Sequence, residues 1–97
     1  MTGVALKPTI KRCDSRNHIV ETLDRNRLFE IQTPQVFSKE LIMKAHERFY
    51  RLNVTDDAAL VEKLGAKVKL VEGSYLNIKI TTPEDLVLAK AINKRLE

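Results

Sequence analysis

The chain has 97 residues, of which 43% are hydrophobic and 5% aromatic, so it suits one small domain or a piece of a larger one and is too apolar for a disordered chain. Its formal net charge of +4 is compatible with phosphate-bearing ligands, but the basic residues form no long run and no aromatic platform accompanies them, so we do not expect nucleic-acid binding. The single cysteine, Cys13, excludes an internal disulfide. Because there is also no secretory signal and no apolar run of about 18 residues, we expect a cytoplasmic protein without a membrane segment.

The N-terminal part predicts a two-stranded arm. Val4 to Arg12 is extended in character, since Pro8 biases the residue before it away from the helical region. A turn-forming cluster occupies residues 14–17, and residues 18–23 form the returning strand. Such a hairpin is only marginally stable alone and has few apolar residues with which to bury a face. We therefore expect residues 4–23 to protrude as an arm.

Two helices follow a short extended stretch at residues 27–32. Ser38 is a good N-cap for a helix over residues 39–52, whose apolar residues fall on one face. Thr55 is the expected N-cap of a second helix, with Asp56 and Asp57 in its first turn, where carboxylates favour the positive end of the helix dipole. Gly65 is suited to end that helix.

The C-terminal part predicts two short strands and a final helix. The strands span residues 67–72 and 77–80, with a turn at residues 73–74 between them. Thr82 and Pro83 begin the final helix, as N-cap and first helical residue. We expect four apolar residues to line its buried face: Leu86, Ala89, Ile92 and Leu96. This mixed order is typical of an α/β or α+β chain, and we expect it to be the last part of a sheet whose central strands lie elsewhere.

Composition and spacing alone identify no catalytic centre. The two histidines and Cys13 lack the spacing of metal ligands, so we expect no metal site within the chain. Arg25 lies at a strand end and Lys79 lies just before the last helix, where cations are suited to hold a phosphate. Either residue is also compatible with an ordinary solvated surface cation, and Thr55 and Thr82 with simple helix caps.

Four separated motifs resemble one enzyme family in the same order. They are T-x-D-R-x-x-L-x-x-x-Q-T-P-Q-x-F at Thr22–Phe37, T-D-D-A from Thr55, V-E-K-L-G from Val61, and L-V-E-G-S-x-x-N-I-K-I-T-T-P-E-D-L-x-L-A from Leu70. Together they resemble the methylerythritol phosphate cytidylyltransferases over nearly the whole chain. Any one of the motifs alone would be a weak signal.

The resemblance implies the C-terminal part of a Rossmann-like α/β nucleotidyltransferase with a protruding β-hairpin arm. It implies transfer of CMP from CTP to 2-C-methyl-D-erythritol 4-phosphate, with Mg²⁺ and release of pyrophosphate, in non-mevalonate isoprenoid synthesis. It also implies a homodimer in which the arm reaches the neighbour's pocket. Arg25 and Lys79 are the expected catalytic residues, which position the substrate phosphate, and Thr9, Thr33 and Thr55 are the expected lining of the same pocket.

The sequence departs from the family at two positions and lacks one family segment. Pro8 stands where the family usually has Asp, and Phe29 where it usually has Trp. No Gly-rich loop for the CTP triphosphate is present. We therefore expect residues 1–97 to be a C-terminal segment, with an arm at 4–23 and a sheet edge with helices at 27–97. CTP and Mg²⁺ would bind outside this segment, and the isolated segment would be inactive.

Two alternatives stay open on the sequence. A ribitol-5-phosphate cytidylyltransferase is closely similar through Q-T-P-Q and N-I-K-I-T-T. A non-catalytic dimerisation module would keep the arm and the sheet edge without the reaction.

Overall fold

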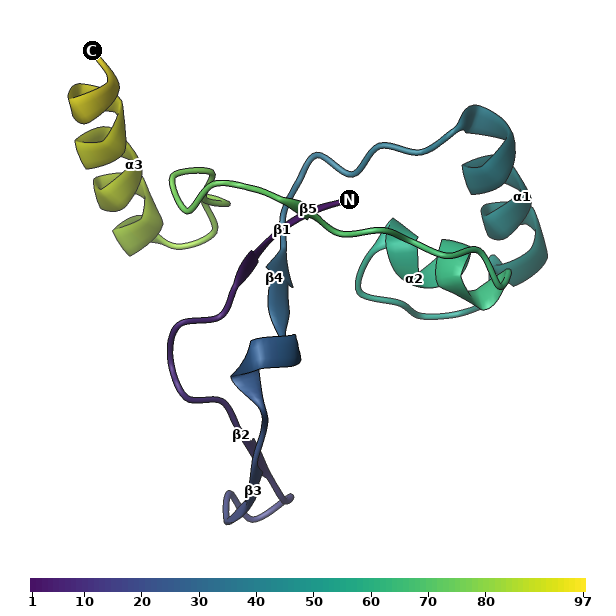
Figure 1. Cartoon of the computed structure of the whole chain (residues 1–97), viewed down its shortest axis with the longest axis horizontal. Coiled ribbons are helices and arrows are strands. Elements are labelled where there is room, and N and C mark those ends of the chain that lie inside the picture. Colours follow the sequence, from purple (N-terminus) through teal and green to yellow (C-terminus); the bar gives the residue numbers. More distant parts are fainter.

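A small three-stranded sheet lies at the centre of the structure, a computed structural model that describes all 97 residues. Strand β1 (Thr2–Ala5) is the middle strand; it pairs antiparallel with β4 (Phe29–Ile31) and parallel with β5 (Val71–Glu72). Helices α1 and α2 lie to one side of this sheet and α3 to the other (Figure 1). The architecture is therefore mixed α/β, with a sheet of only three short strands.

The predicted strand from Val4 to Arg12 is two strands. Its first residues belong to β1 in the central sheet, and its last residues form β2 (Lys11–Cys13), which pairs antiparallel with β3 (Ile19–Thr22). Residues 6–10 between them form no strand, as expected where Pro8 offers no N–H group to a ladder. The expectation of one continuous strand was wrong at this point.

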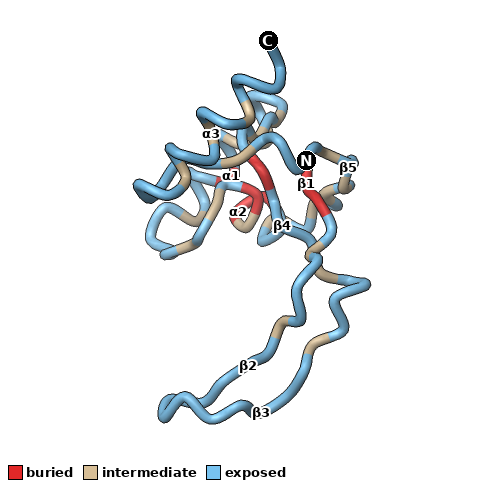
Figure 2. Tube along the Cα trace, turned by 90° about the vertical axis from the view of Figure 1, so that its left-hand side faces the viewer, coloured by how far each residue is buried: buried red, intermediate tan, exposed pale blue.

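The hairpin of β2 and β3 extends away from the rest of the chain (Figures 1 and 2). Every residue from 11 to 22 is exposed. The turn is confirmed: Asp14 Oδ1 accepts hydrogen bonds from the backbone N–H groups of Arg16 and His18, and Asn17 has a positive φ of 63°. Asp and Asn favour such turns because their short side chains bond the local backbone.

A short 3₁₀ helix, η1 (Arg25–Arg27), follows the hairpin and was not predicted. Asp24 caps it, because the carboxylate accepts a hydrogen bond from the backbone N–H of Asn26 at 3.1 Å. The turn returns the chain from the hairpin to β4 in the central sheet.

Helices α1 (Lys39–Phe49) and α2 (Asp57–Lys63) pack together around the main apolar core. The fully buried members of this core are Ala45, Leu60 and Val61. Ser38 caps α1 as predicted, although the helix ends at Phe49 and does not reach residue 52. Figure 2 shows how little of the chain is buried outside this core and β1.

The N-cap of α2 is Asp56, and the prediction of Thr55 was wrong. Asp56 has extended backbone dihedrals, with φ −153° and ψ 168°, and its Oδ1 accepts the N–H of Ala59 at 2.9 Å. Asp is at least as good a cap as Thr, so the choice between neighbours depends on which one the chain holds in the extended conformation. Gly65, with φ +86°, ends the helix as predicted.

The C-terminal part departs most from the predicted elements. The strand expected at residues 67–72 is reduced to β5, and residues 77–80 form no strand. Helix α3 (Pro83–Leu96) begins as predicted with Thr82, which forms a reciprocal capping box with Asp85. Its apolar face is not buried, however: Leu86 and Leu96 are exposed, and Ala89 and Ile92 are only partly covered.

No helix in the chain combines the length and apolarity that crossing a membrane would require.

Candidate functional site

Lys79 lies at a cavity of about 370 Å³ between the central sheet and the start of α3. The side chain is exposed, and its ammonium makes no hydrogen bond or ion pair with another residue. The lining residues are Val4, Glu30, Gln32, Tyr75, Asn77, Ile78, Lys79, Thr81 and Asp85. The cavity therefore combines the free cation of Lys79 with amide and hydroxyl groups and with the carboxylates of Glu30 and Asp85. The Lys79 ammonium is the group in this lining suited to pair with an anionic ligand.

Side-chain hydrogen bonds join the segment just before Lys79 to residues 32 and 33. The Nδ2 of Asn77, two residues before Lys79, donates to the backbone carbonyl of Thr33 at 3.0 Å. The Nε2 of Gln32, next to Thr33, donates to the carbonyls of Ser74 and Asn77 at 2.6 and 3.2 Å. These contacts, here called the clasp (residues 32–33 with 74–77), join positions more than 40 residues apart in the sequence.

Arg25 lies at the base of the hairpin and is linked to the clasp through Lys7 and Tyr75. A guanidinium nitrogen of Arg25 donates to the backbone carbonyl of Lys7. The ammonium of Lys7 lies 3.8 Å from the centre of the Tyr75 ring, and the Tyr75 hydroxyl donates to the carbonyl of Ala5 at 2.6 Å. A cation over an aromatic ring is attracted to the negative face of that ring. Thr9, two residues beyond Lys7, is exposed on the same connection.

Thr55 lies at a different depression from Lys79. It borders a cavity of about 420 Å³ next to α2, which shares no lining residue with the Lys79 cavity. The structure thus joins Thr33 to the segment that leads to Lys79, without placing it in the lining of the Lys79 cavity, and links Arg25 to the adjoining loop. It does not bring Thr55 to the same cavity within this chain.

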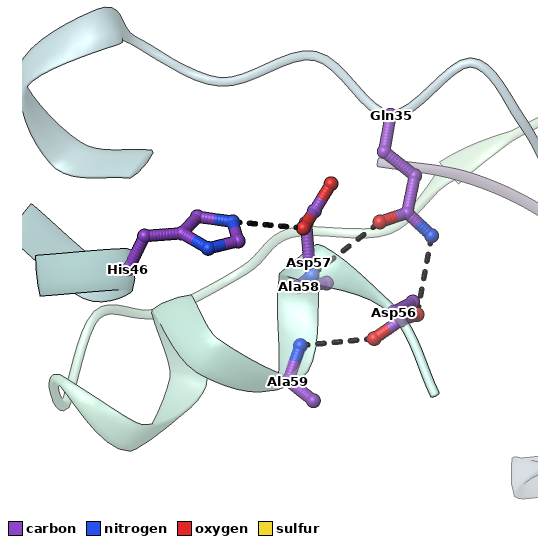
Figure 3. Close-up of polar contacts among 6 residues, drawn as sticks. All are labelled: Gln35, His46, Asp56, Asp57, Ala58 and Ala59. Atoms are coloured by element: carbon purple, nitrogen blue, oxygen red, sulfur yellow. Dashed lines mark hydrogen bonds and ion pairs between the residues drawn. The ribbon is translucent and has the colours of Figure 1, made fainter. Parts of the chain in front are cut away.

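The start of α2 beside Thr55 is held by a polar network (Figure 3). The Gln35 carboxamide donates from Nε2 to Asp56 at 3.1 Å, and its Oε1 accepts from the N–H of Ala58 at 3.3 Å. The His46 Nε2 lies 3.0 Å from the Asp57 carboxylate, which connects α1 to α2. Since both partners are about half exposed, this pair contributes little to stability.

Asp85 carries the only clear change in acidity near the Lys79 cavity. Hydrogen bonds from the backbone N–H groups of Thr82 and Thr81, and from the Thr82 hydroxyl, hold the pKa of the Asp85 carboxyl below its ordinary value of 3.8. Asp85 is therefore a carboxylate engaged in helix capping. Across the whole chain, no group of three or more His, Cys, Asp or Glu side chains is placed to hold a metal ion.

The sequence interpretation gave no role to the residues that organise the cavity. All three main residues lie within the four motifs: Gln32, Asn77 and Tyr75. The linear sequence does not show that these residues lie close together in space. The one available signal was the recurrence of amide side chains in Q-T-P-Q and N-I-K, because amides that bond backbone carbonyls commonly fix loops.

The comparisons with known proteins identify the family. A family model described as 2-C-methyl-D-erythritol 4-phosphate cytidylyltransferase matches residues 1–95. The chain belongs to this family. This result confirms the resemblance that the four sequence motifs indicated.

Curated members of the cytidylyltransferase family match along nearly the whole chain. A protein of that name from Caldanaerobacter subterraneus is 60% identical over 90 residues, which are 91% of this chain and 40% of the relative. The one from Desulforamulus reducens is 53% identical over 95 residues, which are 96% of this chain and 41% of the relative. The chain thus spans about two fifths of the length of the curated relatives it matches.

Solved structures of the family have the same fold over this region. The 4-diphosphocytidyl-2C-methyl-D-erythritol synthase from Anaerococcus prevotii aligns with a TM-score of 0.84 at 40% identity, covering 96% of this chain and 43% of that one. The cytidylyltransferase from Thermus thermophilus aligns with a TM-score of 0.81 at 35% identity, covering 96% and 47%.

Proposed function

We propose that the chain is part of a cytidylyltransferase that transfers CMP from CTP to 2-C-methyl-D-erythritol 4-phosphate, with release of pyrophosphate, in isoprenoid biosynthesis. The family match over residues 1–95 carries this proposal. The unpaired ammonium of Lys79 supports it, because such a group is suited to hold a phosphate. Of the two carboxylates in the same lining, Glu30 and Asp85, the second is engaged in capping α3.

In this proposal Lys79 and Arg25 hold the phosphate of the sugar-alcohol substrate. An oxygen of that phosphate attacks the α-phosphorus of CTP, a new P–O bond forms, and the bond to the β-phosphate breaks as pyrophosphate leaves. Such transfers depend on alignment and on neutralising charge more than on covalent chemistry by the protein. Thr33 belongs to the clasp, while Thr9 and Thr55 would join the pocket from the arm connection and from α2.

The remaining parts of the site are proposed to lie outside these residues. CTP and Mg²⁺ would bind other parts of the protein, of which residues 1–97 would form the C-terminal segment, with a Rossmann-like sheet completed by the rest. The protruding part of the arm, the β2–β3 hairpin at residues 11–22, would pack on a second copy in a homodimer, since the exposed edges of its two strands favour pairing with another chain. We place the enzyme in the cytoplasm, where its unpaired Cys13 stays reduced.

The proposal is tested in a whole enzyme. We would exchange the matching two fifths of the Caldanaerobacter subterraneus relative for this chain and measure pyrophosphate release from CTP and methylerythritol phosphate. We expect this chimera to release pyrophosphate and the isolated 97-residue chain to release none. A folded chimera that binds CTP but is inactive, while the parent relative is active, would overturn the proposal and favour a non-catalytic module.

Lys79→Ala in the chimera tests the site. Losing a hydrogen bond to a charged phosphate costs about 1.5–3 kcal/mol, so kcat/KM should fall about ten- to a hundredfold. Lys90→Ala is the matched control, since it removes one exposed cation from α3, away from the cavity lining. Equal activity of the two variants would remove Lys79 from the site.

The substrate is tested with the unsubstituted chimera. Higher activity with ribitol 5-phosphate than with methylerythritol phosphate would overturn the substrate assignment.

A further inference from the structure

Gln32 is a buried polar residue in a chain that buries few residues. Its exposed fraction is 8%, and it lies just after β4. Burial of an amide without hydrogen bonds is costly, so a buried glutamine is normally fixed by specific partners. Its partners therefore show what the residue does.

The carboxamide of Gln32 bonds the two ends of the segment that leads to Lys79. Its Nε2 donates to the carbonyls of Ser74 and Asn77, and Asn77 closes the same segment through its own N–H, which donates to Ser74 at 3.1 Å. Asn77 also returns a bond from its side chain to Thr33. The turn before Lys79 is thus bonded to one short stretch of chain from both of its ends.

Gly73 lies close to the Oε1 side of the Gln32 carboxamide. Only the NH₂ group of an amide can face two carbonyl oxygens, so Oε1 of Gln32 is directed elsewhere; it is buried and has no donor. A Cβ on Gly73 would lie 2.1 Å from this Oε1, and the Gly73 N–H donates to the carbonyl of Gly3 in β1 at 2.9 Å. The carboxamide therefore lies between the backbone at Gly73, which is bonded to β1, and the turn at residues 74–77.

We infer that Gln32 is a positioning residue of the transfer reaction: it holds the turn at residues 74–77 so that Lys79 faces the phosphate. This inference rests on the proposed function. Gln32 does not itself touch substrate in this assignment. It acts on the backbone that leads to Lys79 through its bonds to Ser74 and Asn77, whereas the Lys79 ammonium itself forms no hydrogen bond or ion pair within the chain. A misplacement of about 1 Å in such a site can lower the rate about a hundredfold.

The first test is Gln32→Met in the chimera. Methionine keeps the length and volume of the side chain but has no donor for the two carbonyls. We expect kcat/KM to fall about tenfold or more, and amide hydrogen exchange at residues 74–79 to become faster. Ser38→Ala is the control, because it removes the N-cap bond of α1 to Leu41 without touching the clasp. It should lower stability but leave kcat/KM and the exchange at residues 74–79 unchanged.

The second test separates positioning from general support of the fold. If Gln32 acts through Lys79, the double variant Gln32→Met with Lys79→Ala should be no less active than Lys79→Ala alone. Losses that multiply, or a Gln32→Met variant with unchanged kcat/KM, would overturn the inference. An unsubstituted chimera without activity would instead be the failure of the proposed function, and the two failures are therefore distinguishable.

Discussion

Replacing Gly73 by alanine should disrupt the clasp by a steric mechanism that can be calculated from the structure. The added Cβ would lie 2.1 Å from Oε1 and 3.2 Å from Cδ of Gln32, far inside van der Waals contact. Because Gly73 does not have a positive φ, the backbone itself tolerates alanine and the cost is due to this contact. The carboxamide must move and lose its two bonds, each with a net value of about 1 kcal/mol. Alanine recovers about 0.4–1 kcal/mol through the unfolded state, which leaves a net destabilisation of about 1–2 kcal/mol.

Urea unfolding of the chimera, compared at equal m-value, measures this effect. The informative comparison is made in a Gln32→Ala background, where the space is free and Gly73→Ala should become neutral or slightly stabilising. Gly65→Ala is the matched control: its Cβ would meet nothing within 4 Å, but its φ of +86° makes alanine strained. Its cost of about 1–2 kcal/mol should be the same in both backgrounds. Additive effects of Gly73→Ala and Gln32→Ala would refute the steric argument.

Three further predictions concern the α2 cap, the α3 cap and the shared site. In the chimera, Asp56→Ala should lower the unfolding free energy by about 1 kcal/mol and Thr55→Ala by clearly less, because Asp56 is the cap; the reverse order in urea unfolding would contradict the assignment. Folding lowers the pKa of Asp85, so its capping contribution is present above pH 3.8 and is lost as pH falls through the lower folded-state pKa. Protection of the amides at the start of α3, relative to their intrinsic exchange rates, should fall over that acid range, and Asp85→Asn should abolish this dependence; an unchanged acid dependence in the variant would refute it. Finally, mixing the weakened Arg25→Ala and Lys79→Ala chimeras should raise pyrophosphate release above that of either parent if Arg25 serves the neighbour's pocket, whereas mixed dimers no more active than either parent would place Arg25 in its own subunit or outside the site.

The exposed face of α3 shows where the sequence pattern and the isolated chain differ. The apolar spacing of α3 predicts a buried face, yet Leu86 is 47% exposed and Leu96 is 68% exposed. The spacing of apolar residues shows which face of α3 is suited to burial. That face becomes buried only where another surface packs against it. A chain that spans about two fifths of its relatives does not supply that surface to α3.

The sequence by itself determined the features that depend on neighbours within a few residues. Ser38 and the Thr82–Pro83 step predicted the starts of α1 and α3, Gly65 the end of α2, and residues 14–17 the hairpin turn. Caps and turns are set by a side chain that bonds the backbone two or three residues away, so the signal is local. The four motifs likewise determined the family, because their order along the chain is itself a sequence property.

Only the tertiary structure decided the features that join distant segments. Thr55 and Asp56 were both acceptable N-caps of α2. Asp56 is the cap in the structure, and its carboxylate also accepts a hydrogen bond from Gln35, 21 residues earlier in the sequence. Residues 77–80 had strand character but have no strand to pair with, and the turn before them is bonded by Gln32 across 42 and 45 residues. Hydrogen bonds between segments so far apart depend on how the chain returns to the sheet, and no local propensity encodes that path.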